Sequence, residues 1–181
     1  MVMLDKDINE LKILISEKEL QEKIKTLAKE IESHFPKKED IYIICVLKGS
    51  VMFCTDLVKH FTNNVQMEFI RISSYGNETR STQNLHAVDL TLPDLHDKNV
   101  VIVEDIIDTG LTARFLTDLF KIKHHPKKLA FVALLNKKCA RQVEIEPDFY
   151  GFEIDDKFVV GYGLDYKGYF RNIPYIGYFP A

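Results

Sequence analysis

Three carboxylates and two threonines fall within nine consecutive residues, inside the stretch VVIVEDIIDTGLT. The acids are Glu104, Asp105 and Asp108, and a small turn then brings Thr109 and Thr112. Backbone N–H groups at a helix start, together with threonine hydroxyls, suit a phosphate. Carboxylates face a phosphate only at a cost, but they accept hydrogen bonds from vicinal sugar hydroxyls and hold Mg²⁺. The pattern predicts a ligand with a phosphate, a diol and a metal ion.

A ribose 5-phosphate that carries a diphosphate at C1 meets these three requirements. A simpler interpretation is that the acids are solvated and that Asp108 or Thr109 only caps the following helix; the crowding of acids and hydroxyls disfavours it. The chain contains neither Gly-x-x-x-x-Gly-Lys-Ser/Thr nor Gly-x-Gly-x-x-Gly after a strand. ATP hydrolysis and dinucleotide binding are therefore disfavoured.

The elements that must position this motif alternate between apolar runs and helical patterns. The apolar runs predict strands at 41–47, 65–74, 99–105 and 128–136, with short strands in PDFYGFEI and KFVVGYGLDY. Helices are expected from the capping box at Ser16 to Pro36, from the residues after KGS to about Phe61, and over 112–122. Such alternation implies an α/β fold with parallel crossovers, whose ligands lie beyond the carboxyl ends of the strands. The acidic motif falls at that place.

One polar segment breaks the alternation. Residues 75–86, YGNETRSTQNLH, have no hydrophobic period and are predicted to form a long mobile loop. The following AVDLTL is expected to be the return strand of a hairpin.

Composition restricts the class of protein. The chain has 181 residues, 46% of them hydrophobic, and a net charge of −3, which suits one compact domain and argues against non-specific nucleic-acid binding. It has no run near the roughly 18 apolar residues of a membrane span and no apolar signal core. Cys45 and Cys139 adjoin apolar runs, as buried free thiols do, which fits a reducing compartment. We expect a cytoplasmic protein without membrane or nucleic-acid partners.

VVIVEDIIDTGLT resembles the phosphoribosyl-diphosphate signature of the type I phosphoribosyltransferases, and in detail that of their hypoxanthine-guanine branch. The motifs VLKGS, RISSYGN, LLNKKCAR, PDFYGFEI, KFVVGYGLDY and YFRN follow the order and spacing of that family, from about residue 41 to 172. The resemblance implies a mainly parallel twisted sheet flanked by helices, a small hood from the chain ends and a mobile active-site loop. Residues 1–181 would form a single domain, with a core over about 35–155 and a hood contribution from 156–181.

By this resemblance, different residues of VVIVEDIIDTGLT would contact the ribose, its 5-phosphate and the base. Glu104 and Asp105 would face the ribose hydroxyls, and the 5-phosphate would be held by the turn Thr109, Gly110, Leu111 and Thr112. Some relatives have a lysine where this chain has Leu111; we expect tolerance, because backbone amides carry most of the contact. Asp108 would exchange a proton with the purine N7 as the catalytic residue, which typically contributes 10²–10⁴-fold.

The diphosphate is expected at VLKGS. A lone lysine is most often solvated, but Lys48 and Gly49 together after a strand fit an anion, because glycine lets it approach the backbone closely. The resemblance adds Arg171 to this group and implies a cis peptide bond between Leu47 and Lys48.

The purine contacts are also implied by the resemblance. Lys137 would donate to the 6-oxo group, Phe158 would stack on the ring, and the backbone of Val159 would meet its two-amino edge. Lys138 replaces Lys137 if the register slips by one. Asp165 would hold Mg²⁺ together with Glu104 and Asp105. Ser74 and Tyr75 would begin a loop that closes over the site and excludes water.

The implied activity is purine salvage. The enzyme would move phosphoribosyl from 5-phosphoribosyl 1-diphosphate to N9 of hypoxanthine, and of guanine, giving IMP or GMP and diphosphate, with Mg²⁺, as a homodimer or homotetramer. A related enzyme that acts on xanthine or another oxopurine is the nearest alternative. A regulatory or RNA-binding protein would need an extra basic surface, and a signalling receiver domain would need further strand–helix units after residue 105; neither is visible.

Overall fold

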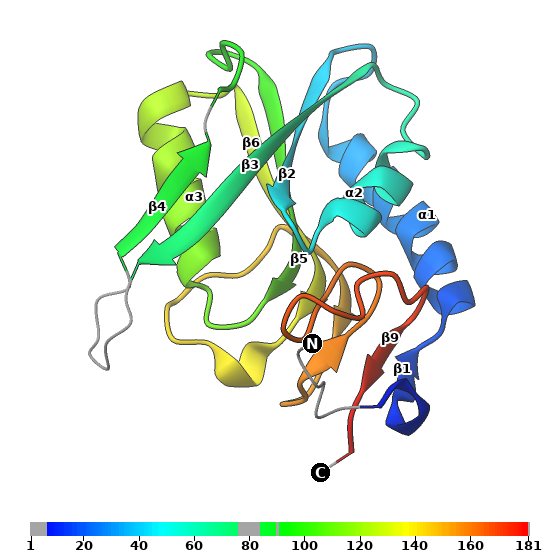
Figure 1. The fold of residues 1–181 in the computed structure, drawn as a ribbon. Helices are drawn as coiled ribbons and strands as arrows, with labels where there is room; N and C mark the ends of the chain where they lie inside the picture. Colours follow the sequence, from blue (N-terminus) through cyan, green and yellow to red (C-terminus); the bar gives the residue numbers. More distant parts are fainter. Residues whose placement is uncertain (1–6, 76–83, 90, 181) are drawn as a thin grey trace.

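The computed structural model describes residues 7–75, 84–89 and 91–180, and its centre is a six-stranded sheet (Figure 1). The strand order is β4-β3-β2-β5-β6-β7. Five strands are parallel, and β4 runs antiparallel to its neighbour β3. The strands are β2 (Ile41–Leu47), β3 (Val65–Tyr75), β4 (Asn84–Asp89), β5 (Asn99–Ile107), β6 (Lys128–Asn136) and β7 (Phe149–Glu153). The predicted α/β class and parallel sheet are confirmed.

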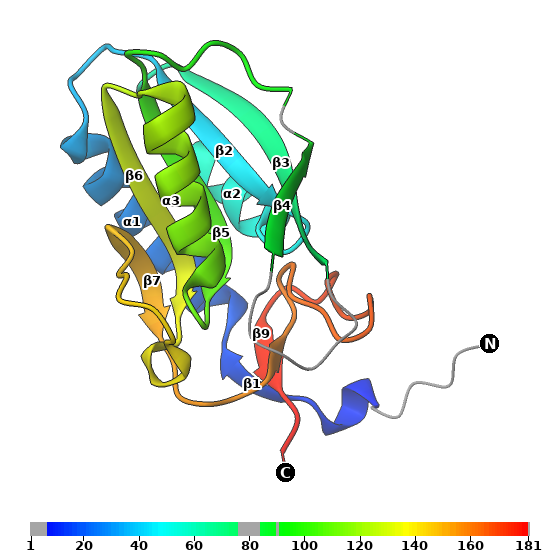
Figure 2. The ribbon, with the colours of Figure 1, turned by 90° about the vertical axis from the view of Figure 1, so that its left-hand side faces the viewer.

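Helices cover both faces of this sheet. The helix α3 (Leu111–His124) lies on one face, and α1 (Glu17–His34) and α2 (Val51–Val58) lie on the other (Figure 2). The capping box at the start of α1 is confirmed, since Ser16 N donates to Glu19 Oε2 at 2.8 Å and Glu19 N to Ser16 Oγ at 3.3 Å. α2 ends three residues before the predicted Phe61, because His60 N donates only to Leu57 O in a tight turn.

A second, three-stranded sheet lies beyond the carboxyl ends of the parallel strands (Figure 1). Its order is β1-β9-β8, all antiparallel. We call it, with the loop 161–175, the hood; its strands are β1 (Lys12–Ile15), β8 (Val159–Val160) and β9 (Ile176–Tyr178). Short 3₁₀ turns occur at Ile8–Glu10 and Lys138–Ala140. Both ends of the chain therefore contribute to the hood, as expected.

The predicted hairpin is present, but its two strands extend into the segment expected to be a loop. β3 continues to Tyr75, which pairs with Asn84, the first residue of β4. The prediction that 75 and 84–86 belong to a loop is wrong, because the antiparallel ladder extends over them. The rest of the predicted loop, 76–83, lies outside the described residues. The expected loop-starting residues Ser74 and Tyr75 are the last two of β3.

The core separates into one apolar cluster on each face of the sheet and a small one in the hood. Cys45 and Cys54 are buried between β2 and α2, whereas Cys139 is exposed. The prediction of a buried Cys139 is wrong, because the apolar run of β6 ends at Asn136 and the cysteine falls in the surface 3₁₀ turn. Within the described residues, no helix is long and apolar enough to cross a membrane.

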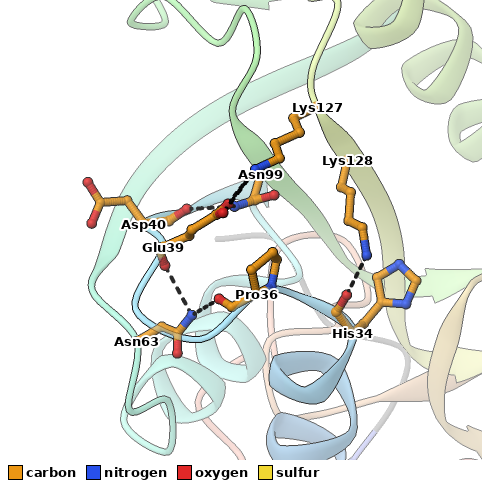
Figure 3. Close-up of polar contacts among 8 residues, drawn as sticks. All are labelled: His34, Pro36, Glu39, Asp40, Asn63, Asn99, Lys127 and Lys128. Carbon is orange, nitrogen blue, oxygen red and sulfur yellow. Dashed lines mark hydrogen bonds and ion pairs between the residues drawn. The ribbon is translucent and has the colours of Figure 1, made fainter.

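Polar side chains join neighbouring segments at the amino-terminal end of the sheet (Figure 3), the end opposite the hood (Figure 1). Glu39 accepts two bonds of 2.9 Å from Lys127 Nζ and one of 2.8 Å from Asn99 Nδ2. Asn63 Nδ2 donates to the carbonyls of Pro36 and Glu39 at 3.2 and 3.0 Å. These bonds tie the segments before β2, β3 and β6 to the start of β5 without using any residue of the motif.

One carboxylate at this end makes a testable contribution to stability. Glu32 Oε1 accepts the N–H groups of Thr62 and Asn63, both at 2.6 Å. Burial raises the pKa of Glu32, but these bonds outweigh it and bring the net pKa below its ordinary 4.5. We expect Glu32→Ala to lower the free energy of unfolding by about 1–2 kcal/mol at neutral pH.

Chemical denaturation of the wild type, Glu32→Ala and Glu30→Ala measures this effect, since Glu30 lies on the same helix and is exposed. A carboxylate with a depressed pKa stabilises above its unfolded-state pKa and loses that effect as the pH falls through its folded-state pKa. The gap between the wild type and Glu32→Ala should therefore shrink below about pH 4.5. Equal losses of unfolding free energy in Glu32→Ala and Glu30→Ala would show that the bonds from Thr62 and Asn63 to Glu32 do not stabilise the fold.

Candidate active site

The three acids of the motif lie at the carboxyl end of β5, with different exposures. Glu104 is buried, Asp105 is half-buried and Asp108 is exposed. The strand continues two residues beyond the predicted end at 105, because Ile107 still pairs with Asn136 of β6. The first two acids therefore project from a strand, whereas Asp108 lies in the turn that follows.

Burial makes the first two carboxylates costly to charge. It raises the pKa of Glu104 well above the ordinary range, and the charge of Asp105 raises it further. Burial likewise raises the pKa of Asp105 to about 6, although the N–H of Ile106, at 2.9 Å, and the charge of Arg171 oppose it. A buried carboxylate next to a half-buried one is stabilised in its charged form by a cation or by hydrogen-bond donors from a ligand.

The threonine turn opens α3 without a side-chain cap. Gly110 is the N-cap, with φ +84°, so the interpretation of Asp108 or Thr109 as the N-cap is wrong. Thr109 Oγ1 accepts from Leu111 N at 3.4 Å. The turn surrounds a hollow of about 80 Å³, lined by Glu104, Ile106, Ile107, Asp108, Thr109, Gly110, Thr112 and Ala113. An uncapped helix start beside a small hollow has the geometry that a phosphate requires.

A larger cavity of about 350 Å³ adjoins this hollow and shares Glu104 and Thr112 with it. Its lining also includes Lys48, Gly49, Asp105, Asp165 and Arg171. The structure thus brings together the residues expected for the diphosphate and the metal ion, although they are up to 123 positions apart in sequence. The peptide bond between Leu47 and Lys48 is cis, as predicted.

The backbone of the hood approaches the backbone of the VLKGS loop closely beside this cavity. A Cβ atom at Gly163 would lie 2.0 Å from the carbonyl oxygen of Gly49. Arg171 Nη1 donates to Gly163 O at 2.6 Å, and its Nη2 pairs with Asp165 at 2.5 Å. The two charged groups that sequence analysis assigned separately, Asp165 to metal and Arg171 to diphosphate, form an ion pair with each other.

Asp56, which the sequence analysis did not single out, links the hood to α1 and α2 through its hydrogen bonds. Asp56 of α2 accepts from Tyr162 Oη at 2.6 Å, from Gln21 Nε2 of α1 at 3.0 Å and from Lys59 Nζ at 2.6 Å. Burial raises the pKa of Tyr162, and its bond to Asp56 raises it further. The sequence shows Tyr162 as an aromatic residue before Gly163, but nothing in it indicates that the hydroxyl of Tyr162 would bond to Asp56.

Removal of this hydroxyl should destabilise the protein. We expect Tyr162→Phe to lower the free energy of unfolding by about 1–2 kcal/mol, because Asp56 loses a partly buried donor. Tyr150→Phe is the matched control, since the Tyr150 hydroxyl makes no hydrogen bond among the described residues. Thermal unfolding of both variants measures the difference, and equal melting temperatures would exclude a role for the Tyr162–Asp56 bond.

The residues expected at the purine lie just after β6 and at the start of β8, a strand of the hood. Lys137 is nearly buried; its N–H donates to Ile107 O at 2.9 Å and its Nζ pairs with Asp156 at 2.8 Å. Phe158 is 61% exposed and meets the ring of Tyr166 edge-on at 5.8 Å. Lys138, the alternative to Lys137, instead pairs with Glu153 on β7 at 2.8 Å. Both lysines are therefore ion-paired, Lys137 beside the end of β5 and Lys138 against β7.

The acids of the site fit a Mg²⁺ ion that the protein and the substrate coordinate together. Across 7–75, 84–89 and 91–180, no three His, Cys, Asp or Glu side chains converge as a metal cage. Mg²⁺ does not need such a cage, because it keeps several waters and binds through one or two carboxylates plus substrate oxygens. The raised pKa values of Glu104 and Asp105 agree with a site completed by a cation.

Comparison with known proteins gives similarities over nearly the whole chain. Residues 13–167 match the family model described as the phosphoribosyl transferase domain. The hypoxanthine-guanine phosphoribosyltransferase of Bacillus subtilis (strain 168) is 43% identical over 166 residues, which are 92% of this chain and 91% of that protein. A crystal structure of a hypoxanthine-guanine phosphoribosyltransferase from Bacillus anthracis is 46% identical, with a TM-score of 0.87, over 92% of this chain and 97% of that one. A hypoxanthine phosphoribosyltransferase from Staphylococcus aureus is 35% identical, with a TM-score of 0.88, over 95% and 93% of the two chains.

Proposed function

The chain belongs to the phosphoribosyltransferase family, and we propose that it transfers phosphoribosyl from 5-phosphoribosyl 1-diphosphate to N9 of hypoxanthine or guanine. The products are IMP or GMP and diphosphate, in a purine-salvage reaction. One observation carries this proposal: the 350 Å³ cavity and the 80 Å³ hollow share the buried acid Glu104. A sugar between a diphosphate and a 5-phosphate fits such a pair of adjoining spaces.

The chain acts mainly by positioning and charge stabilisation. The uncapped start of α3 binds the 5-phosphate, and Lys48, Gly49 and Arg171 bind the diphosphate. Glu104 and Asp105 accept hydrogen bonds from the ribose hydroxyls, and their charge stabilises a sugar that becomes cationic as diphosphate leaves. By the family resemblance, a lid that follows Ser74 and Tyr75, the last residues of β3, would close over the site and keep water from that cation.

The base is oriented by protein groups that contact its six-membered ring and its five-membered ring. Lys137 donates to the 6-oxo group, Phe158 stacks on the ring and the Val159 backbone meets the two-amino edge. Asp108 takes the proton from N7. An adenine amino group would leave the Lys137 ammonium without an acceptor, which selects against adenine.

Mg²⁺ is the proposed cofactor. Glu104 and Asp105 would hold it, with Asp165 as a further ligand once Arg171 turns to the diphosphate. When bound, the ion neutralises charge on the diphosphate and so favours its departure.

Incubation of the protein with the phosphoribosyl donor, Mg²⁺ and one base at a time tests the proposal. Hypoxanthine, guanine, xanthine and adenine are compared by chromatography of the nucleotides formed. We expect IMP and GMP and at most traces of AMP. Nucleotide from xanthine alone would move the assignment to the related xanthine enzyme, and no nucleotide from any base would refute it.

We further propose that residues 1–181 form one phosphoribosyltransferase domain and that the enzyme is cytoplasmic. The family resemblance supports a homodimer or homotetramer. Light scattering coupled to size-exclusion chromatography tests the oligomeric state, and a monomer at micromolar concentration would refute it.

A further inference from the structure

An ion pair at the purine end of the site has no part in the scheme above. Lys137 Nζ lies 2.8 Å from Asp156 Oδ1. The two side chains differ in environment, since that of Lys137 is 11% exposed and that of Asp156 is 84% exposed. Lys137 follows β6, and Asp156 lies in the loop between β7 and β8, so the pair joins the end of the parallel sheet to the entrance of the hood.

The backbone of Lys137 is held independently of this pair. Its N–H donates to the carbonyl of Ile107 at 2.9 Å, which fixes the residue beside the end of β5. The remaining freedom is that of the four-carbon side chain, and among the described residues Asp156 is its one ion-pair partner. Asp156 therefore determines where the ammonium lies before a base arrives.

A second carboxylate acts on the same ammonium. The bond to Asp156 raises the pKa of Lys137 against the effect of burial, and the charge of Asp108 raises it as well. Lys137 is thus paired with an exposed acid, and its backbone is bonded to Ile107, the residue before the acid proposed to take the N7 proton. The 6-oxo and N7 positions are neighbours on one edge of an oxopurine, so a donor and an acceptor placed side by side match that edge.

We propose that Asp156 is a positioning residue for base recognition, which rests on the proposed function. Its carboxylate holds the Lys137 ammonium so that a remaining N–H points toward the 6-oxo group. An unrestrained lysine side chain loses rotamer freedom when it binds, and preorganisation by Asp156 removes that cost from the binding step. Asp156 lines neither the cavity nor the hollow assigned to the diphosphate and the sugar phosphate, so we expect its effect on the base alone.

The neighbouring acid provides a matched control. Asp155 is exposed, carries the same charge and is adjacent in sequence, and its side chain makes no ion pair among the described residues. Asp155→Asn removes one negative charge from the same loop without changing the contact to Lys137. Asp156→Glu restores the carboxylate on a longer stem and serves as the conservative variant.

Steady-state kinetics of the full-length enzyme test the proposal. We expect Asp156→Asn to raise KM for hypoxanthine and guanine by about 5- to 20-fold. Its kcat and its KM for the phosphoribosyl donor should stay within about twofold of the wild type, because those steps do not use Lys137. Asp155→Asn should match the wild type, and Asp156→Glu should recover part of the lost affinity.

An additional readout follows the ammonium directly. Reductive methylation with ¹³C-formaldehyde labels the lysines, and Lys137→Arg identifies the Lys137 signal in NMR spectra. We expect that signal to titrate at lower pH in Asp156→Asn than in Asp155→Asn. An unchanged titration, or a base KM in Asp156→Asn equal to that in Asp155→Asn, would overturn the positioning role alone. A wild-type enzyme that converts no base would overturn the proposed function and this role with it.

Discussion

Asp108→Asn should lower kcat by about 10²–10⁴-fold, the usual contribution of a positioned proton-transfer group. Asparagine has nearly the same shape, but its amide cannot take the N7 proton at neutral pH. Asp108 is exposed and is not the N-cap of α3, which is Gly110. The variant should therefore fold normally and bind the phosphoribosyl donor with an unchanged KM.

Two measurements separate this effect from a general change in charge. Asp118→Asn removes an exposed acid from α3, the helix that follows the motif, and should retain full turnover. Thermal unfolding of Asp108→Asn should agree with the wild type within a few degrees, as is usual for surface substitutions. A kcat for Asp108→Asn within threefold of the Asp118→Asn value would show that Asp108 does not transfer the proton.

Gly49→Ala should reduce kcat/KM for the phosphoribosyl donor by about 10²–10³-fold, a loss of roughly 3–4 kcal/mol of transition-state stabilisation. A Cβ atom at this position would lie 1.5 Å from Asp105 Oδ2 and 2.5 Å from its Cγ. The carboxylate must then leave its place in the cavity. The added methyl group would also keep the diphosphate from the loop backbone.

Gly168→Ala is the control, because it also replaces a glycine but its new methyl group would not collide with a neighbouring atom. Gly168 has φ +87°, and a Cβ there would meet nothing within 4 Å. Its cost is backbone strain of about 1–2 kcal/mol, which affects stability more than substrate binding. If Gly49→Ala retained a kcat/KM within threefold of the Gly168→Ala value, the close approach of Gly49 and Asp105 would not matter for catalysis.

The elements that were predicted well are those with a local cause. The capping box of α1 and its buried stripe depend on residues three and four positions apart, and both are present in the structure. The strand before the acids is a continuous apolar run, as a strand buried on both faces must be. The boundaries were less accurate: β3 and β5 both run beyond their predicted ends, because pairing with a neighbouring strand extends them.

The order of the motifs along the chain was sufficient to assign the family and to place the acids at the carboxyl ends of parallel strands. The residues that hold these acids and their neighbours in place came only from the tertiary structure. Tyr162 and Asp56 are 106 positions apart, and neither belongs to a pattern that names the other. The pairing of Arg171 with Asp165, and of Lys137 with Asp156, likewise depends on how the hood lies against the sheet.

By itself, then, the sequence determined which chemical groups this protein brings to its site, because residue type and short-range spacing set both local structure and chemistry. The tertiary structure decided which of those groups restrain one another. The physical reason is that a side-chain contact across the fold depends on the relative placement of two distant segments. That placement is set by the packing of the whole core rather than by the residues in contact.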